Sequence, residues 1–153
     1  MKIRFVKKQF LLVCCFLTVF TVFSQQTTVN VHVITDFNNA LELYNNKAYA
    51  AAQKIFDKIN VQAEKNASIK ADAAYYGAMC AVILNQTNAD QKVLDFVEEN
   101  PTSNKKNKAF FNVANYYFAN KKASYALKWY EKVNTDLLSK EDQKELNFKM
   151  GYS

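Results

Sequence analysis

The residues able to perform acid–base, nucleophilic or metal chemistry are few and scattered. The 153-residue chain has one histidine, His32, and three cysteines, and it contains neither a glycine-rich phosphate loop nor a serine-nucleophile motif. The acidic pairs Glu98–Glu99 and Glu141–Asp142 are adjacent in sequence, so on a helix the two carboxylates of each pair point in different directions. Catalysis by these groups requires that they converge. We therefore expect no enzyme activity, no cofactor, no metal site and no small-molecule substrate.

The positive charge of the chain is concentrated at its beginning. The formal net charge is +6, yet four basic residues lie among the first eight and no acidic residue precedes Asp36. Without residues 1–24 the chain has 16 basic and 14 acidic residues. A surface for phosphate backbones needs basic side chains clustered on the folded part. We therefore expect no nucleic-acid partner.

Residues 1–24 have the three parts of a secretory signal peptide. A basic start precedes an apolar run from Phe10 to Phe23, and the segment ends in Ser24 with Val22 two residues before it. The apolar run of 14 residues would span about 21 Å as a helix, less than the ~30 Å of a bilayer core. We expect cleavage before Gln25 and export, with a retained membrane helix as the alternative. Cleavage would leave Cys80 as the single thiol, in the apolar pattern of a helix.

Residues 25–35 alternate apolar and polar side chains. Val29, Val31 and Val33 are separated by polar residues, and this alternation of β-branched residues favours an extended backbone. No second strand is visible in the sequence to pair with it. We therefore expect a flexible or extended lead-in over residues 25–35.

The rest of the chain repeats with a period of 37 residues. Residues 109–133 read as two amphipathic helices joined by a polar turn, and small residues recur at the same positions in the segments before and after them. These small residues, expected to allow close helix packing, are Ala40, Gly77, Ala114 and Gly151 on the first helices and Ala52, Ala89 and Ala126 on the second. A period between 20 and 50 residues is typical of solenoids, and the two glycines and one proline are too few for the turns of a β fold.

We therefore expect an all-α solenoid of antiparallel helix pairs. The units predicted from the pattern are residues 36–66, 67–103 and 104–138, followed by a partial unit at 139–153.

The order of residues within each unit resembles the tetratricopeptide repeat. A small residue is followed by an aromatic residue or leucine, a polar turn, alanine, and further large apolar residues. The matching positions are Ala40, Leu43, Tyr49, Ala52, Phe56 and Ile59 in the first unit, Gly77, Ala89, Phe96 and Pro101 in the second, and Ala114, Tyr117, Ala126, Tyr130 and Val133 in the third. The period of 37 exceeds the 34 usual in that family. The segment from Phe96 to Phe111 is similar to repeats of exported Gram-negative envelope proteins.

This resemblance implies a non-catalytic scaffold of the bacterial cell envelope that captures a protein or peptide in a concave aromatic groove. The location it implies is the periplasm or the outer membrane, or secretion. The groove would be lined by the first helix of each unit. The candidate contact residues are Phe37, Leu41, Tyr44, Tyr75, Ala78, Phe111, Asn112, Asn115 and Phe118. The alternative role for each aromatic residue among them is to fill space between stacked helices.

A second reading concerns the partial fourth unit. It ends at residue 153, within what the repeat predicts to be its first helix, and it carries the apolar residues Leu146, Phe148 and Met150. A terminal repeat normally presents a polar outer face. The alternative function is therefore a structural or self-assembling fragment of a longer repeat protein that associates through this uncapped C-terminal repeat.

Overall fold

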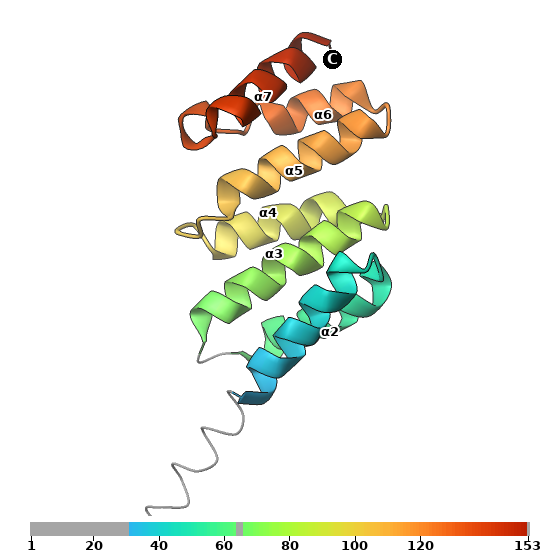
Figure 1. Ribbon diagram of the computed structural model, residues 1–153, viewed down its shortest axis with the longest axis vertical. Coiled ribbons are helices and arrows are strands. Elements are labelled where there is room, and N and C mark those ends of the chain that lie inside the picture. The colour runs from blue at the N-terminus through green and yellow to red at the C-terminus, as the bar shows by residue number, and fades with distance from the viewer. Residues whose placement is uncertain (1–30, 64–65, 153) are drawn as a thin grey trace, which may run out of the picture.

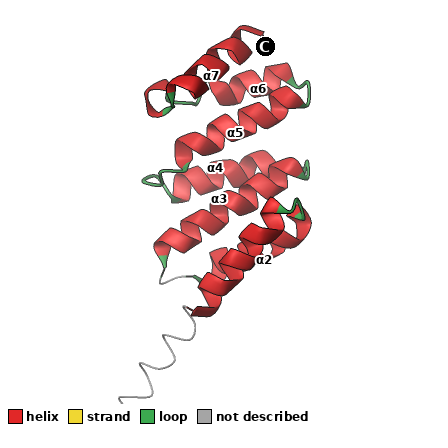
Figure 2. Cartoon of the chain, viewed as in Figure 1, coloured by secondary structure: helices red, strands yellow, loops and turns green. Residues whose placement is uncertain are grey.

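The computed structural model describes residues 31–63 and 66–152, and this part of the chain is all-α with no strand (Figure 2). Residues 31–45 are helical. The elements that follow are α2 (Tyr49–Gln62), α3 (Ala67–Ile83), α4 (Ala89–Glu99), α5 (Lys106–Ala119), α6 (Ala123–Tyr130), the short 3-10 helix η1 (Thr135–Leu137) and α7 (Lys140–Tyr152). The prediction of an all-α fold is confirmed. The predicted signal peptide at residues 1–24 lies outside the described residues.

The helices pack mainly against their neighbours in the sequence. Contacts join α2 to α3, α3 to α4, α5 to α6 and α6 to α7, and α3 also touches α5. Val33 and Ala40 of the 31–45 helix share a core with Phe56 of α2. Figure 1 shows the result as a stack along the long axis, with the 31–45 helix at one end and α7 at the other. The domain therefore consists of about seven helices packed in adjacent pairs.

The core has two parts, and α3 contributes to both. Ala73 and Cys80 of α3 are buried with the 31–45 helix and α2, whereas Tyr75 and Ala78 of the same helix are buried with α4 and α5. Apolar residues occupy nearly every side of α3, as expected for a helix covered all round. This central helix joins the two parts into one body.

The same turn ends three of the helices. A residue with positive φ follows each helix, and its N–H donates to the carbonyl of the residue three positions before it. The N–H of the residue after it donates to the carbonyl five positions before that residue, and all these bonds are 2.8 to 3.0 Å long. This pair of bonds is the Schellman motif, which satisfies the last carbonyls of a helix. The positive-φ residues are Lys47 (62°), Asn85 (52°) and Lys121 (59°). Each turn sends the chain back along the helix that it has just completed.

The small residues of the 37-residue period are buried, with one exception. Ala40, Ala52, Ala89, Ala114 and Ala126 lie in the core, and Gly77 is buried against Phe56 of α2. Gly151, which the period predicted to be a packing residue, is instead exposed, and a Cβ built on it would have nothing within 4 Å. The reason is that, among the described residues, no helix covers this face of α7.

The lead-in prediction is wrong for residues 31–35, which are helical. Val33 is only 8% exposed, and the Thr35 hydroxyl donates to the carbonyl of Val31 at 2.9 Å, a bond across one helical turn. Val33, Phe37 and Ala40 are spaced by four and three residues, so they share one helix face toward α2 and α3. Burial of that face outweighs the weak local preference of β-branched residues for extended backbone.

In residues 31–63 and 66–152 no helix combines the length and the apolar character needed to span a bilayer.

The Schellman turns generate a stability prediction. Lys47 and Lys121 have positive φ, and a side chain with a Cβ in this left-handed region costs roughly 1–2 kcal/mol. Glycine removes that cost but loses about 0.5–1 kcal/mol more backbone entropy on folding. Lys47→Gly and Lys121→Gly should therefore each raise the free energy of unfolding in urea by about 0.5–1 kcal/mol. Asn85→Gly is the control. It should gain less, because asparagine tolerates this conformation and its side chain accepts a hydrogen bond from Lys122. A loss of stability in both lysine variants would contradict the assignment.

The equivalent positions 114 and 151 generate a second prediction. Ala114 is fully buried, so Ala114→Leu should lower the free energy of unfolding by about 1–3 kcal/mol through overpacking. Gly151→Leu should not lower the free energy of unfolding, because leucine favours helix and a side chain at this position meets open space. Chemical denaturation of both variants compares the two sites. Equal losses would show that α7 is covered in solution.

Candidate functional site

The nine predicted contact residues divide into two groups in the structure. Three of them are core residues: Tyr75 is 3% exposed, Ala78 2% and Phe111 7%. Their burial means that they cannot touch a partner in this conformation, which corrects the prediction for these positions. Six are half-buried and keep one side toward solvent: Phe37, Leu41, Tyr44, Asn112, Asn115 and Phe118. These six residues, on the 31–45 helix and α5, are together called the candidate face below.

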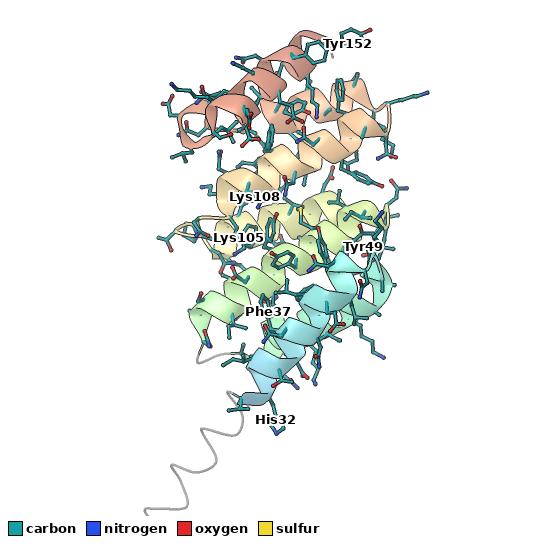
Figure 3. The ribbon with its side chains drawn as sticks, viewed as in Figure 1. His32, Phe37, Tyr49, Lys105, Lys108 and Tyr152 are labelled. Carbon is teal, nitrogen blue, oxygen red and sulfur yellow. The ribbon has the colours of Figure 1, made fainter. Side chains whose placement is uncertain are left out.

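An aromatic cluster supports the 31–45 end of the candidate face. The ring of Tyr76 on α3 lies 5.2 Å from Tyr44 and 6.2 Å from Phe37, both edge to face, and stacks on Phe56 at 5.3 Å. The ring of Tyr49 lies 5.4 Å from that of Tyr44, and Figure 3 labels both Phe37 and Tyr49. Such ring pairs contribute about 0.5–1.5 kcal/mol each beyond area burial. Phe37 and Tyr44 are therefore held in place by rings behind them.

Sequence reasoning missed Tyr76. It does not lie on a recurring position of the 37-residue period, because Asn39 and Val113 occupy the equivalent places. The available signal was helical spacing, since Ala73, Tyr76 and Cys80 share one face of α3 and pack on the same core.

Side-chain hydrogen bonds connect the α5 part of the face to its neighbours. Asn112 Nδ2 donates to the Tyr75 hydroxyl at 2.8 Å, joining α5 to α3. Asn115 Oδ1 accepts from the Tyr130 hydroxyl at 2.6 Å and from Lys149 Nζ at 3.0 Å, joining α5 to α6 and α7. Lys149 also lies 5.5 Å above the ring of Phe118. Two amides one turn apart on α5 thus tie together four helices.

The two tyrosines in these bonds stay protonated. Burial raises the pKa of the Tyr75 hydroxyl well above its usual value, with a smaller contribution from the nearby hydroxyl of Tyr44. Burial also raises the pKa of Tyr130, and the carboxylate of Glu145 adds to the effect. Tyr130 needs its proton because its hydroxyl donates to Asn115, whereas the oxygen of Tyr75 accepts from Asn112. Both hydroxyls therefore keep their protons across the physiological pH range.

Two solvent-open cavities lie away from this face, beside the connection between α4 and α5. One of about 500 Å³ is lined by residues that include Asp72, Glu99 and Pro101. The other, of about 320 Å³, is lined by residues that include Lys106, Phe110 and Lys132. None of the nine predicted contact residues lines either cavity. The candidate face and these cavities are separate surfaces.

The groups considered for chemistry do not converge in the described part of the chain. His32 is exposed on the 31–45 helix. In residues 31–63 and 66–152 no group of three or more His, Cys, Asp or Glu side chains could hold a metal ion. Cys80 is fully buried in the core, and burial, followed by the carboxylate of Asp57, raises the pKa of its thiol to about 12. A thiol with that pKa is a poor nucleophile at neutral pH.

Comparison of the chain with protein-family models, with curated proteins and with solved structures found no match.

The buried thiol generates a pH prediction. The pKa of Cys80 is about 12 in the folded chain against an ordinary value of 9.0, so the folded state holds this proton more tightly. The contribution of the protonated Cys80 thiol to the free energy of unfolding is fully present below pH 9. It falls by roughly 1 kcal/mol per pH unit as the pH rises from 9 toward 12. Chemical denaturation at pH 8.5 to 10 should show this loss.

Cys80→Ala is the matched variant. It should be less stable at pH 8, because it lacks a buried side chain, but its stability should change less between pH 9 and 10. Parallel pH profiles for the two proteins would contradict the assignment of the titration to Cys80.

Proposed function

We propose that this chain is a non-catalytic protein-binding scaffold, built as a tetratricopeptide-like array of helix pairs and exported to the bacterial envelope. The observation that carries the proposal is the repeated local structure. The three Schellman residues are 38 and 36 positions apart, and buried small residues recur every 37. The hydrogen bond between Tyr75 and Asn112 joins residues that are 37 apart, as expected for equivalent positions on stacked helices.

The candidate face has the composition of a peptide-binding surface. Phe37, Leu41 and Tyr44 supply partly exposed apolar area at one end, and Asn112, Asn115 and Phe118 supply two amides and a ring at the other. Peptide recognition commonly combines apolar anchors with hydrogen bonds to the peptide backbone. Because the rings and amides are already held by neighbouring helices, little side-chain freedom would be lost on binding.

The two amides of α5 match the backbone of an extended peptide. The Oδ1 atom of Asn115 accepts hydrogen bonds from Tyr130 and Lys149, and these two bonds orient the amide. Its Nδ2 group is therefore left to donate elsewhere. Asn112 uses Nδ2 for Tyr75, which leaves its Oδ1 to accept. Within the described part of the chain these two atoms make no hydrogen bond. One donor and one acceptor a helical turn apart can bind the carbonyl and N–H of a peptide unit.

The location of the partner surface can be tested by site-specific photocrosslinking. A benzophenone amino acid at Leu41, on the candidate face, should crosslink an envelope protein in living cells. The same amino acid at Ile55, which is also half-buried but lies on α2, is the control and should not crosslink it. Equal yields at the two positions would count against the face.

The amide mechanism has a sharper test with the crosslinked partner. Asn115→Asp keeps an oxygen for Tyr130 and Lys149 but replaces the free donor with an acceptor. The variant should fold with unchanged thermal stability and bind the partner about 10-fold or more weakly. Binding weakens because the hydrogen bond from Nδ2 to the peptide carbonyl is lost and because the new carboxylate repels that carbonyl oxygen. Unchanged affinity would remove Asn115 from the binding surface.

A further inference from the structure

The smaller of the two cavities beside the α4–α5 connection lies where three segments of the chain meet. These are the α4–α5 connection, the first turns of α5, and the segment that runs from the end of α6 through η1. Figure 1 shows the α4–α5 connection and the start of α7 at the same edge of the stack. The volume of about 320 Å³ falls within the range of small-molecule pockets, roughly 300–1,000 Å³. This cavity is called the α5 cavity below.

Apolar side chains form part of the wall of the α5 cavity. Phe110 of α5 is buried up to one edge, and its ring lies 6.1 Å from that of Trp129 on α6. Leu137 of η1 also lines the cavity, although its side chain is 70% exposed. These two residues offer a contact surface for the apolar part of a ligand.

Hydrogen bonds fasten the two sides of the α5 cavity to each other. Asn107 Nδ2 donates to the carbonyl of Asn134 at 3.0 Å, and Asn107 Oδ1 accepts from the N–H of Asn134 at 2.7 Å. The side chain of Asn134 accepts in turn from the N–H of Asp136, which starts η1. The wall from α5 and the wall from η1 are therefore held at a fixed separation before any ligand binds.

Both charged side chains that line the α5 cavity are cations. Lys106 is the first residue of α5, and Lys132 follows the end of α6 by two residues. Within the described part of the chain, neither lysine makes an ion pair, whereas the adjacent Lys105 is paired with Asp72 at 2.7 Å. Two cations without a counter-ion therefore border one cavity.

Carboxylates lie near the α5 cavity but do not line it. Glu99 lines the larger cavity, which shares the wall of Pro101, Ser103 and Asn104 with the α5 cavity. Glu131 and Asp136 are exposed close by in the sequence, and neither belongs to the lining. The first turn of α5 has no acidic residue, so the positive end of this helix adds to the charge of the two lysines.

We propose that the α5 cavity binds a small organic anion. The charged group pairs with Lys106 and Lys132, and the apolar part packs against Phe110 and Leu137. An inorganic anion would leave the apolar wall uncovered, and a neutral apolar molecule would leave both cations unpaired. None of the candidate-face residues lines this cavity, so failure of this proposal leaves the peptide-binding proposal standing, and the reverse also holds.

The test is a titration of the full chain with 3-phenylpropionate. Trp129 is the single tryptophan of the chain and lies beside Phe110, so its fluorescence reports on the cavity. We expect a saturable change with a dissociation constant of about 1 mM or lower for a ligand of this size. Two probes that each lack one part, 3-phenylpropan-1-ol without the charge and acetate without the ring, should bind about 10-fold or more weakly.

A parallel titration with phenyl phosphate identifies the charged group. Lysine pairs with carboxylates and with phosphates, so saturable binding of either anion supports the proposal. The tighter of the two shows which group the natural ligand carries. Binding of both should weaken as salt is added, because the two lysines are accessible to solvent.

Variants show whether the ligand occupies this cavity. Lys106→Met with Lys132→Met should weaken binding about 10-fold or more. The matched control is Lys108→Met with Lys144→Met, which removes the same charge from exposed lysines that do not line the cavity. This control also alters the first turn of α5, so it separates a contact with the ligand from an effect on the helix.

A second pair of variants tests the apolar wall. Leu137→Ser should weaken binding about 3-fold or more, and Val61→Ser, at a 76% exposed position on α2, should not. All these variants change exposed or half-buried side chains, so thermal unfolding should show that they stay folded. The proposal would be overturned by no saturable binding of either anion, by equal binding of the alcohol, or by equal losses in the lysine variants and their control.

Discussion

The structure depends on one interaction, the burial of each helix face by the next helix in the chain. Small side chains such as Ala114 and Ala126 are fully buried where neighbouring helices meet. Their size lets the helices approach closely, so that rings such as Phe111 and Tyr130 pack across the same contact. Because the packing partners are mostly neighbours in sequence, much of the apolar burial comes from local contacts, which also favours rapid folding.

The central helix α3 has a further role, because it links the two ends of the candidate face. Two adjacent residues of α3 contact different neighbouring helices. Tyr76 packs edge to face against rings of the 31–45 helix and stacks on Phe56 of α2, whereas the hydroxyl of Tyr75 accepts a hydrogen bond from Asn112 of α5. One rigid helix therefore sets the positions of the aromatic end and the amide end together. The side chains of the candidate face are therefore held in place by neighbouring helices.

Sequence periodicity identified the helices that carry the candidate face but not which residues in them stay exposed. Phe111 and Asn112 are neighbours, yet the first is buried against α6 and the second is half-buried beside Tyr75. Successive residues of a helix point about 100° apart. The rotation of α5 against its neighbours therefore decides which of them reaches solvent, and this rotation is set by packing between whole helices. The same reason explains why Tyr75 and Ala78 are core residues.

The amino-acid sequence by itself determined the helical class, the polar turns and the small residues that recur every 37 positions, since these follow from side-chain spacing and from the scarcity of glycine and proline. Tertiary structure decided the rest. Residues 31–35 are helical because Val33 is buried by other helices, against its local preference. Gly151 is exposed although Ala114 at the equivalent position is buried. Burial depends on whether a neighbouring helix is present, and this is a property of the assembled domain rather than of any one segment.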